Sequence, residues 1–190
     1  MKKYIFGTLL LLCITIFSSF IWFAQDDDYN SFKQDFLDLI NKTRTKGCKC
    51  GNTYFPPAPP MVWNNDLEDA AIGHAKDMAR QNYFSHESKD GRTMNNRIVA
   101  AGYVFKGWKS FMIGENIAFG QTSIPEVMAG WFKSEGHCRN LMNPGFKEVG
   151  VAENNKFWVQ DFGGRIPFSE EQQKLIKSGK YRLIQKDPGY

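Results

Sequence analysis

Hydrophobic and polar residues alternate along this chain with two different periods, and the longer period predicts helices. Apolar residues recur on one helical face over residues 31–44, and again over residues 65–81 behind a capping Asn64. A shorter helix should span residues 93–102, between a capping threonine and a terminating glycine. A fourth helix should span residues 123–136, which open with a capping box.

The shorter, alternating period predicts strands. It favours one strand over residues 111–118 and two more within residues 149–162, joined by a turn at Asn154 and Asn155. The Cys, Gly and Pro residues of segment 47–60 are typical of a loop. Because helices and strands mix without a regular strand, helix, strand order, the pattern favours an α+β fold with an antiparallel sheet.

Residues 1–24 are typical of an export segment. Lys2 and Lys3 precede an apolar run of roughly 20 residues, long enough to span a bilayer. Cleavage at the end of this run would leave the bulky Trp22 where a small residue is preferred, so an uncleaved membrane anchor stays open beside a removed signal peptide. In both cases residues 25–165 should form one extracytoplasmic domain, which is secreted, periplasmic or anchored through the N-terminus.

The charge of the chain limits the classes of partner that we expect it to bind. The formal net charge is +4, and the two leader lysines account for half of it, which leaves about +2 on the exported part. Acidic and basic residues are interleaved there, so the chain lacks the basic patch of a nucleic-acid-binding protein. We expect a monomer that meets the membrane only through its N-terminal segment.

Residues 166–190 form a basic tail after the domain. Its first part, residues 169–178, has the pattern of a short capped amphipathic helix, and residues 181–184 resemble a strand. The tail either packs on the domain or touches an anionic surface through its lysines, and we expect packing.

Three cysteines lie beyond the leader, and an odd number in an oxidising compartment means that one differs from the others. Cys48 and Cys50 are poorly placed to bridge each other, because one residue between them forces a strained loop. We therefore expect a disulfide between Cys138 and either Cys48 or Cys50. A zinc site of three thiolates is the rival interpretation.

Five short motifs occur in order along residues 31–164, and together they resemble the CAP superfamily (the SCP domain of cysteine-rich secretory proteins, antigen 5 and pathogenesis-related proteins) in its bacterial secreted form. A single match of this kind would carry little weight, whereas five ordered matches are specific. The motifs are Asn41 to Arg44, Phe84-Ser85-His86, Gly114-Glu115-Asn116-Ile117, Gly136-His137 with Asn140 to Pro144, and Trp158 to Gly163.

The resemblance implies a three-layer α-β-α sandwich with a central antiparallel sheet and a solvent-open pocket of two histidines and two glutamates. The corresponding residues are His86, Glu115, Glu135 and His137. Two neutral imidazoles would hold an exchangeable divalent metal, with zinc expected, and the carboxylates would accept hydrogen bonds from its waters. Each residue also has a structural interpretation as a turn or packing residue. His74, on the apolar stripe of a helix, is expected to be a hydrogen-bonded core histidine.

Three functions follow as hypotheses, and the favoured one is a non-catalytic envelope or extracellular module that binds a metal, a small ligand or an envelope component. The second is a metal-dependent hydrolase, peptidase-like, in which His86 and His137 carry the cation and Glu115 activates water, with Glu135 as a further candidate catalytic residue. A glycosidase that uses the same two carboxylates ranks behind it. The third is lipid or sterol carriage, which some relatives of the resembled family show and which needs an apolar groove.

Overall fold

The computed structural model describes residues 29–104 and 106–182, so the proposed leader and residues 183–190 lie outside the described residues. A first helix occupies residues 29–44. The later helices are α2 (Asn65–Gln81), α3 (Met94–Ala100), α4 (Ile124–Lys133), α5 (Glu135–Met142) and α6 (Glu170–Lys177). The strands are β1 (Cys48–Cys50), β2 (Thr53–Phe55), β3 (Val62–Trp63), β4 (Ser110–Phe119), β5 (Glu148–Asn154) and β6 (Phe157–Ile166).

Four strands form the central sheet in the order β3-β5-β6-β4, which places β4 at an edge. β4, β6 and β5 pair antiparallel, as the alternating pattern predicts, whereas the two-residue β3 pairs parallel to β5. The register sets Glu115 on β4 opposite Asp161 on β6. Partners in this register point to the same face of the sheet, so two carboxyl groups share one face.

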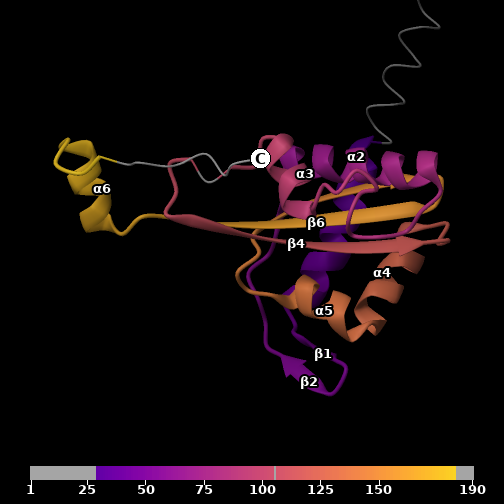
Figure 1. Ribbon diagram of the computed structural model, residues 1–190. Helices are drawn as coiled ribbons and strands as arrows, with labels where there is room; N and C mark the ends of the chain where they lie inside the picture. The colour runs from indigo at the N-terminus through magenta and orange to yellow at the C-terminus, as the bar shows by residue number, and fades with distance from the viewer. Residues whose placement is uncertain (1–28, 105, 183–190) are drawn as a thin grey trace, which may run out of the picture. The chain divides into compact units, whose positions relative to one another are not determined.

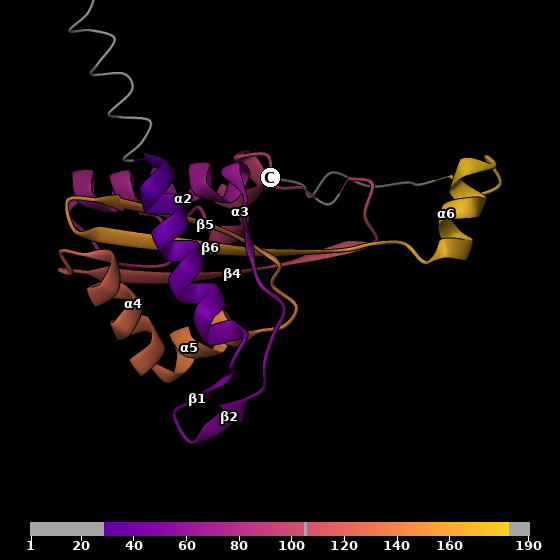
Figure 2. The ribbon, with the colours of Figure 1, turned by 180° about the vertical axis from the view of Figure 1, so that it is seen from behind.

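Helices cover both faces of this sheet and give three layers. α2 and α3 lie on one face, and α4 and α5 lie on the other, as Figures 1 and 2 show from opposite sides. α2 buries its alanine-rich stripe, including Ala71, Ala75 and Met78, in a cluster with sheet residues. The α2 backbone approaches β5 so closely that a Cβ atom on Gly150 would lie 2.1 Å from the backbone nitrogen of Glu68. The predicted three-layer sandwich is confirmed.

One predicted helix boundary is wrong, and one segment predicted to be a loop contains two strands. The helix expected over residues 123–136 ends at Lys133, because Ser134 takes an extended backbone conformation, and α5 then begins at Glu135 and runs through Gly136. Gly136 was expected to stop a helix, but it lies inside one. The segment expected to be a loop after the first helix also contains the β1–β2 hairpin, which pairs Cys48 with Phe55 and Cys50 with Thr53.

The C-terminal tail contains the expected short helix. Ser169 caps α6 through a capping box with Gln172, yet none of the α6 residues is buried. Residues 181–182 form no strand, and the rest of the expected strand lies outside the described residues. Within the described ranges, no helix combines the length and the apolar character needed to cross a membrane.

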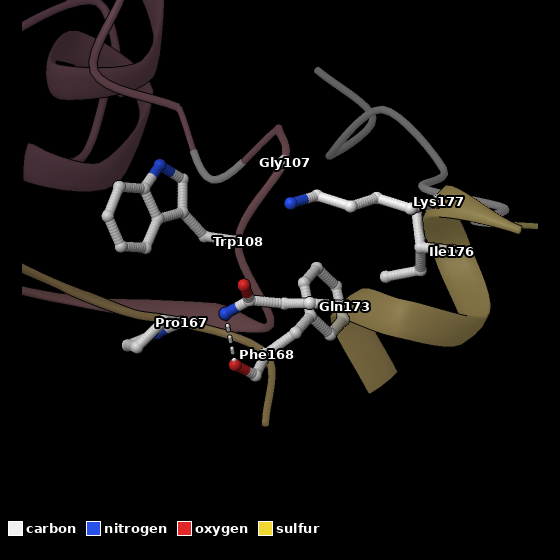
Figure 3. Close-up of a pocket in the computed structure, with 7 residues that line it drawn as sticks. All are labelled: Gly107, Trp108, Pro167, Phe168, Gln173, Ile176 and Lys177. Atoms are coloured by element: carbon white, nitrogen blue, oxygen red, sulfur yellow. Dashed lines mark hydrogen bonds between the residues drawn. The ribbon is translucent and has the colours of Figure 1, made fainter. Parts of the chain in front are cut away.

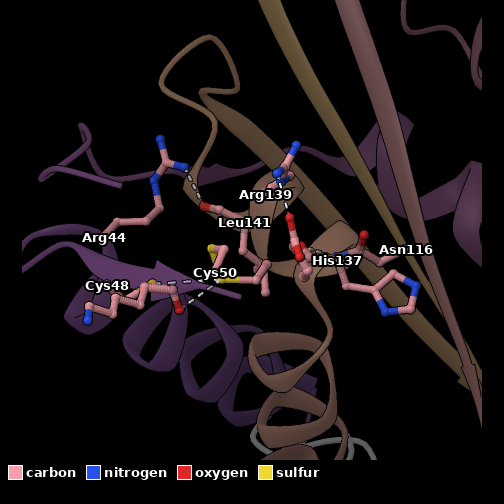
Figure 4. The surroundings of a disulfide bond; sticks show 10 residues. Arg44, Cys48, Cys50, Asn116, His137, Arg139 and Leu141 are labelled. Carbon is pink, nitrogen blue, oxygen red and sulfur yellow. Dashed lines mark hydrogen bonds and ion pairs between the residues drawn. A yellow bond between two sulfur atoms is a disulfide. The ribbon is translucent and has the colours of Figure 1, made fainter. Parts of the chain in front are cut away.

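Asn41 and Arg44 at the end of the first helix hold the layers together rather than joining the pocket. The Asn41 amide both donates to and accepts from the backbone of Met61. The buried guanidinium of Arg44 donates to the backbone carbonyls of Pro59, Leu141, Asn143 and Phe146, and Figure 4 shows the bond to Leu141. Burial lowers the pKa of Arg44 to about 10. Four accepting carbonyls are the compensation that a buried positive charge needs.

Candidate functional site

A buried carboxylate, Glu115, is the centre of the candidate site. Its Oε1 lies 2.7 Å from Nδ1 of His86, and its Oε2 accepts a hydrogen bond of 2.7 Å from Nη2 of Arg97. The Glu115 and Arg97 side chains are 1% and 4% exposed, whereas the His86 side chain is 59% exposed. Because Glu115 accepts at Oε1, Nδ1 of His86 is the donor in this contact, and in a neutral ring the lone pair is then on Nε2.

Asp161 lies beside this carboxylate as its partner across β4 and β6. It is fully buried, and neither carboxyl oxygen has a hydrogen-bond partner among the described residues. Burial, followed by the negative charge of Glu115, raises the pKa of Asp161 well above its ordinary value. The neutral acid is therefore the favoured form, and Arg97 balances the single negative charge of Glu115.

His74 positions the loop that carries His86. It lies buried on α2, as expected of a core histidine, and its Nε2 is 2.9 Å from the backbone oxygen of Ser85. This geometry requires a proton on Nε2. Burial is the main cause that lowers the pKa of His74, with the positive charge of Arg97 as the second. A neutral His74 thus fixes the residue next to His86.

His137 reaches the site from the opposite layer. Its backbone oxygen accepts from the Asn116 side chain, and Asn140 on the same helix donates to the Glu115 backbone and to Asn116. Burial is the main cause that lowers the pKa of His137, and a protonated His86 would lower it further. Figure 4 shows its ring directed away from the disulfide and toward the sheet. His86, Glu115 and the α5 segment that carries His137 therefore lie around the edge strand β4.

Glu135 has different surroundings from the other predicted pocket residues. Its exposed carboxylate pairs with Arg139 one turn along α5. It also lies next to the β1–β2 turn, where a Cβ atom on Gly51 would clash with its carboxylate. Glu135 thus has its charge neutralised at the surface. Of the four predicted pocket residues, the hydrogen bonds of Glu115, Asn116 and Asn140 involve His86, Glu115 and the His137 backbone, and they do not involve Glu135.

The cysteines form a second cluster, behind α5. Cys50 and Cys138 form a disulfide, which confirms one of the two expected pairings, and Cys48 is the free cysteine among the described residues. These three cysteines are also the one group of three or more possible metal-ligating side chains in the described ranges whose ligand atoms all lie within 4.8 Å. Among the described residues, His86 and His137 belong to no such group of three.

Two hollows lie in the described part of the chain near aromatic residues. One, of about 260 Å³, lies between β4 and α4, with His137 and the exposed Phe84 and Phe119 in its lining. The other, of about 370 Å³, separates Trp108 from α6 and is shown in Figure 3. There Gln173 donates to the Phe168 carbonyl. Only the first hollow adjoins the candidate site.

Sequence reasoning missed Arg97 and Asp161 as members of this site. Arg97 lies on a short helix with no motif of its own, and only its burial reveals that it neutralises Glu115. Asp161 stands within the Trp158 to Gly163 motif, whose other residues are apolar, glycine or amide-bearing. An acidic residue in the middle of a buried strand was the signal that could have marked it.

Two curated relatives from Bacillus subtilis (strain 168) match most of the described domain. One is the uncharacterized membrane protein YlbC, 31% identical over 130 residues, which covers 68% of this chain and 34% of the relative. The other is the uncharacterized protein YkwD, 31% identical over 139 residues, which covers 72% of this chain and 48% of the relative. The chain therefore spans between a third and half of the length of these relatives.

Solved structures agree with the fold. An extracellular protein with an SCP domain from Bacillus anthracis superimposes with a TM-score of 0.59 at 34% identity, covering 73% of this chain and 41% of that one. An outer surface protein from Borrelia burgdorferi gives 0.54 at 19% identity, covering 73% and 93%, and supports the fold alone. The family model for the cysteine-rich secretory protein family matches residues 37–162. This chain belongs to that family, the CAP superfamily.

Proposed function

We propose that this chain is an extracytoplasmic, non-catalytic binding module. It holds an exchangeable divalent cation between His86 and His137, and zinc is the cation that we expect. The observation that best supports this proposal is the 2.7 Å contact between His86 Nδ1 and Glu115 Oε1. A histidine that binds metal through one ring nitrogen usually donates from the other to a carboxylate, and this arrangement supplies that donor and acceptor pair before any metal arrives.

The residues present fit such an ion in three respects. Glu115 engages Nδ1 of the exposed His86 side chain, so Nε2 is the ring nitrogen left for a metal. The lowered pKa of His137 keeps its imidazole neutral near neutral pH, and a neutral ring is the form that binds metal. Two histidines leave the other coordination positions to water or to a ligand group, so the ion would polarise whatever occupies them. An ion held by two ligands would exchange readily.

A hydrolase that uses Glu115 as its base is the alternative, and the hydrogen bonds of Glu115 argue against it. One carboxylate oxygen accepts from Arg97 and the other from His86, at 2.7 Å each. A general base needs an oxygen within reach of the proton that it removes, and both oxygens here are engaged. Glu135 is occupied by Arg139. Binding without turnover therefore accounts better for these contacts.

The extracytoplasmic location rests on three observations. The export-type segment of residues 1–24 precedes the domain, the Cys50–Cys138 disulfide suits an oxidising compartment, and the Bacillus anthracis relative is described as extracellular. A fractionation experiment on cells that produce the full chain would test this location. Recovery of the intact chain in the cytoplasm would contradict it.

Zinc binding tests the cation proposal directly. Equilibrium dialysis of the chain with Cys48→Ser removes the free thiol as a competing ligand, so that uptake reports the histidines. In that background, His86→Ala with His137→Ala should abolish binding, and Glu115→Gln should weaken it about 10- to 100-fold. Glu135→Gln is the matched control and should leave affinity unchanged. Equal zinc uptake by the double histidine variant would overturn the proposal.

An activity assay separates the module from the hydrolase. Zinc-loaded protein would be incubated with peptides and with peptidoglycan fragments, and products would be followed by mass spectrometry. We expect no turnover. Turnover that Glu115→Gln abolishes and Glu135→Gln retains would replace the module with the enzyme.

A second candidate, binding of a small apolar ligand, is favoured by the hollow of about 260 Å³ beside His137. Its lining includes Ile117, Trp131 and the half-exposed Phe119, and such a volume suits a small group better than a whole sterol. Gly130 also lines it and has open space for a side chain. Gly130→Leu should therefore reduce binding of a fluorescent fatty acid, and equal binding by this variant would remove the candidate.

A further inference from the structure

Cys48, Cys50 and Cys138 bring three sulfur atoms together outside the histidine site. Cys48 and Cys50 are two residues apart on β1, so their side chains point to the same face of the hairpin. That face meets Cys138 on α5, and Figure 4 shows the cluster. The Cys48 sulfur lies 3.8 Å from the Cys138 sulfur, at van der Waals contact, while Cys138 is bonded to Cys50.

We propose that these cysteines form a thiol–disulfide exchange site, in which the Cys48 thiolate attacks the Cys138 sulfur and releases Cys50. The Cys48–Cys138 bond forms as the Cys50–Cys138 bond breaks, and the electron pair of the broken bond leaves on Cys50. The proton lost by Cys48 is matched by the proton that Cys50 gains from solvent. One disulfide and one thiol are present before and after, so the exchange needs no external oxidant or reductant.

The contact geometry also requires the Cys48 side chain to move before it can react. A thiolate attacks along the axis of the disulfide, so the Cys48 side chain must rotate to the side of Cys138 opposite Cys50. The β1–β2 hairpin is a two-stranded sheet separate from the central one, and it contacts α5 through the disulfide and through a small apolar cluster that includes Phe55 and Met142. Such a hairpin has little stability of its own, which allows the rotation.

Differences in exposure make Cys48 the link between the buried pair and external thiols. Cys50 and Cys138 are 0% exposed, whereas Cys48 is partly exposed. A small disulfide in the surroundings therefore reacts first with the Cys48 thiolate. After the exchange, an external thiolate can attack the exposed Cys48 sulfur of the Cys48–Cys138 bond, which releases Cys138 as the leaving thiolate. Burial raises the pKa of the Cys48 thiol, so the thiolate is scarce near neutral pH and the exchange accelerates in alkali.

The experiment maps the free thiol in the folded chain. Cys13→Ser leaves the three clustered cysteines, and the protein is incubated without reductant at pH 6.5 and pH 9. After acid quenching, free thiols are blocked with N-ethylmaleimide in denaturant, and peptic peptides are fragmented by mass spectrometry. We expect maleimide on both Cys48 and Cys50. As long as the Cys48 thiol is mostly protonated, the product labelled at Cys50 should form about tenfold faster for each pH unit of increase. Maleimide on Cys48 alone at both pH values, after hours, would overturn the proposal.

Two variants add a test that does not depend on rates. Cys50→Ser in glutathione redox buffer should form the Cys48–Cys138 disulfide, because the two sulfurs already touch. Cys138→Ser is the matched control, and it should keep two free thiols, since Cys48 and Cys50 are strand neighbours. A Cys50→Ser protein with a native circular dichroism spectrum and two free thiols would contradict the exchange site.

Discussion

Replacing Arg97 with methionine should expose how the candidate site balances its charges. Methionine keeps much of the side-chain volume but removes the guanidinium, which lies 2.7 Å from Glu115 in surroundings where both side chains are less than 5% exposed. Glu115 would then be a buried carboxylate opposite Asp161, with His86 as its remaining basic partner. Removing one partner of a buried ion pair costs about 3–5 kcal/mol.

A double-mutant cycle that adds Glu115→Gln separates the effect of the charge from the effect of the other contacts of Arg97. Arg97 also donates to Ser88 and to the backbone of Arg92, and these two bonds stay lost in the double variant at about 1 kcal/mol each. If an uncompensated charge is the main cost, Arg97→Met with Glu115→Gln should be more stable than Arg97→Met alone. We expect a recovery of about 2 kcal/mol.

Urea unfolding followed by tryptophan fluorescence measures the four proteins of this cycle. The single Arg97→Met variant should also melt several degrees lower, on the order of 10 °C for a domain of this size. Two results would refute the reasoning: a loss below about 1 kcal/mol for Arg97→Met, or a double variant less stable than Arg97→Met by the full cost of Glu115→Gln.

Three further predictions test other contacts of the fold. Because the pKa of His74 is lowered in the folded chain, the unfolded chain takes up a proton more readily, and stability falls as pH drops below about 6.5. The variant His74→Gln stays neutral, so it should lose less stability than the wild type between pH 7.5 and 5.5 in urea titrations. Gly150→Ala should cost at least about 1–3 kcal/mol by the same assay, because its Cβ would overlap the α2 backbone, and a neutral effect would contradict this packing. Cys138→Ser should cost about 2–4 kcal/mol, since the disulfide joins residues 88 apart, whereas Cys48→Ser should change stability by less than about 0.5 kcal/mol.

Local patterns predicted the elements whose signals are long and regular. α2 begins after the predicted Asn64 cap and ends at Gln81, and β4 exceeds the predicted strand by one residue at each end. The α4–α5 boundary was misjudged because Gly136 is a common helix terminator and nothing in the sequence reveals the extended backbone at Ser134. The β1–β2 hairpin was missed because its strands have three residues each, too few to show a period.

The candidate site was predictable where a motif carried it and not where tertiary packing did. His86, Glu115 and His137 stand in three separate motifs. The structure joins the side chains of His86 and Glu115, and it bonds the backbone of His137 to Asn116 on β4. Arg97 was invisible because a buried arginine looks like any surface arginine until its partner is known. The choice of Cys50 over Cys48 also needed the fold, since both cysteines face α5 and only their distances from Cys138 separate them.

The most direct measurement of the central claim is an anomalous diffraction map from crystals of the chain equilibrated with zinc, recorded at the zinc absorption edge. The account predicts a peak within about 2.0–2.1 Å of His86 Nε2 and of a ring nitrogen of His137, while Glu115 still contacts His86 Nδ1. A map at saturating zinc with no peak at these two histidines, or with a peak only at the cysteine cluster, would contradict the account.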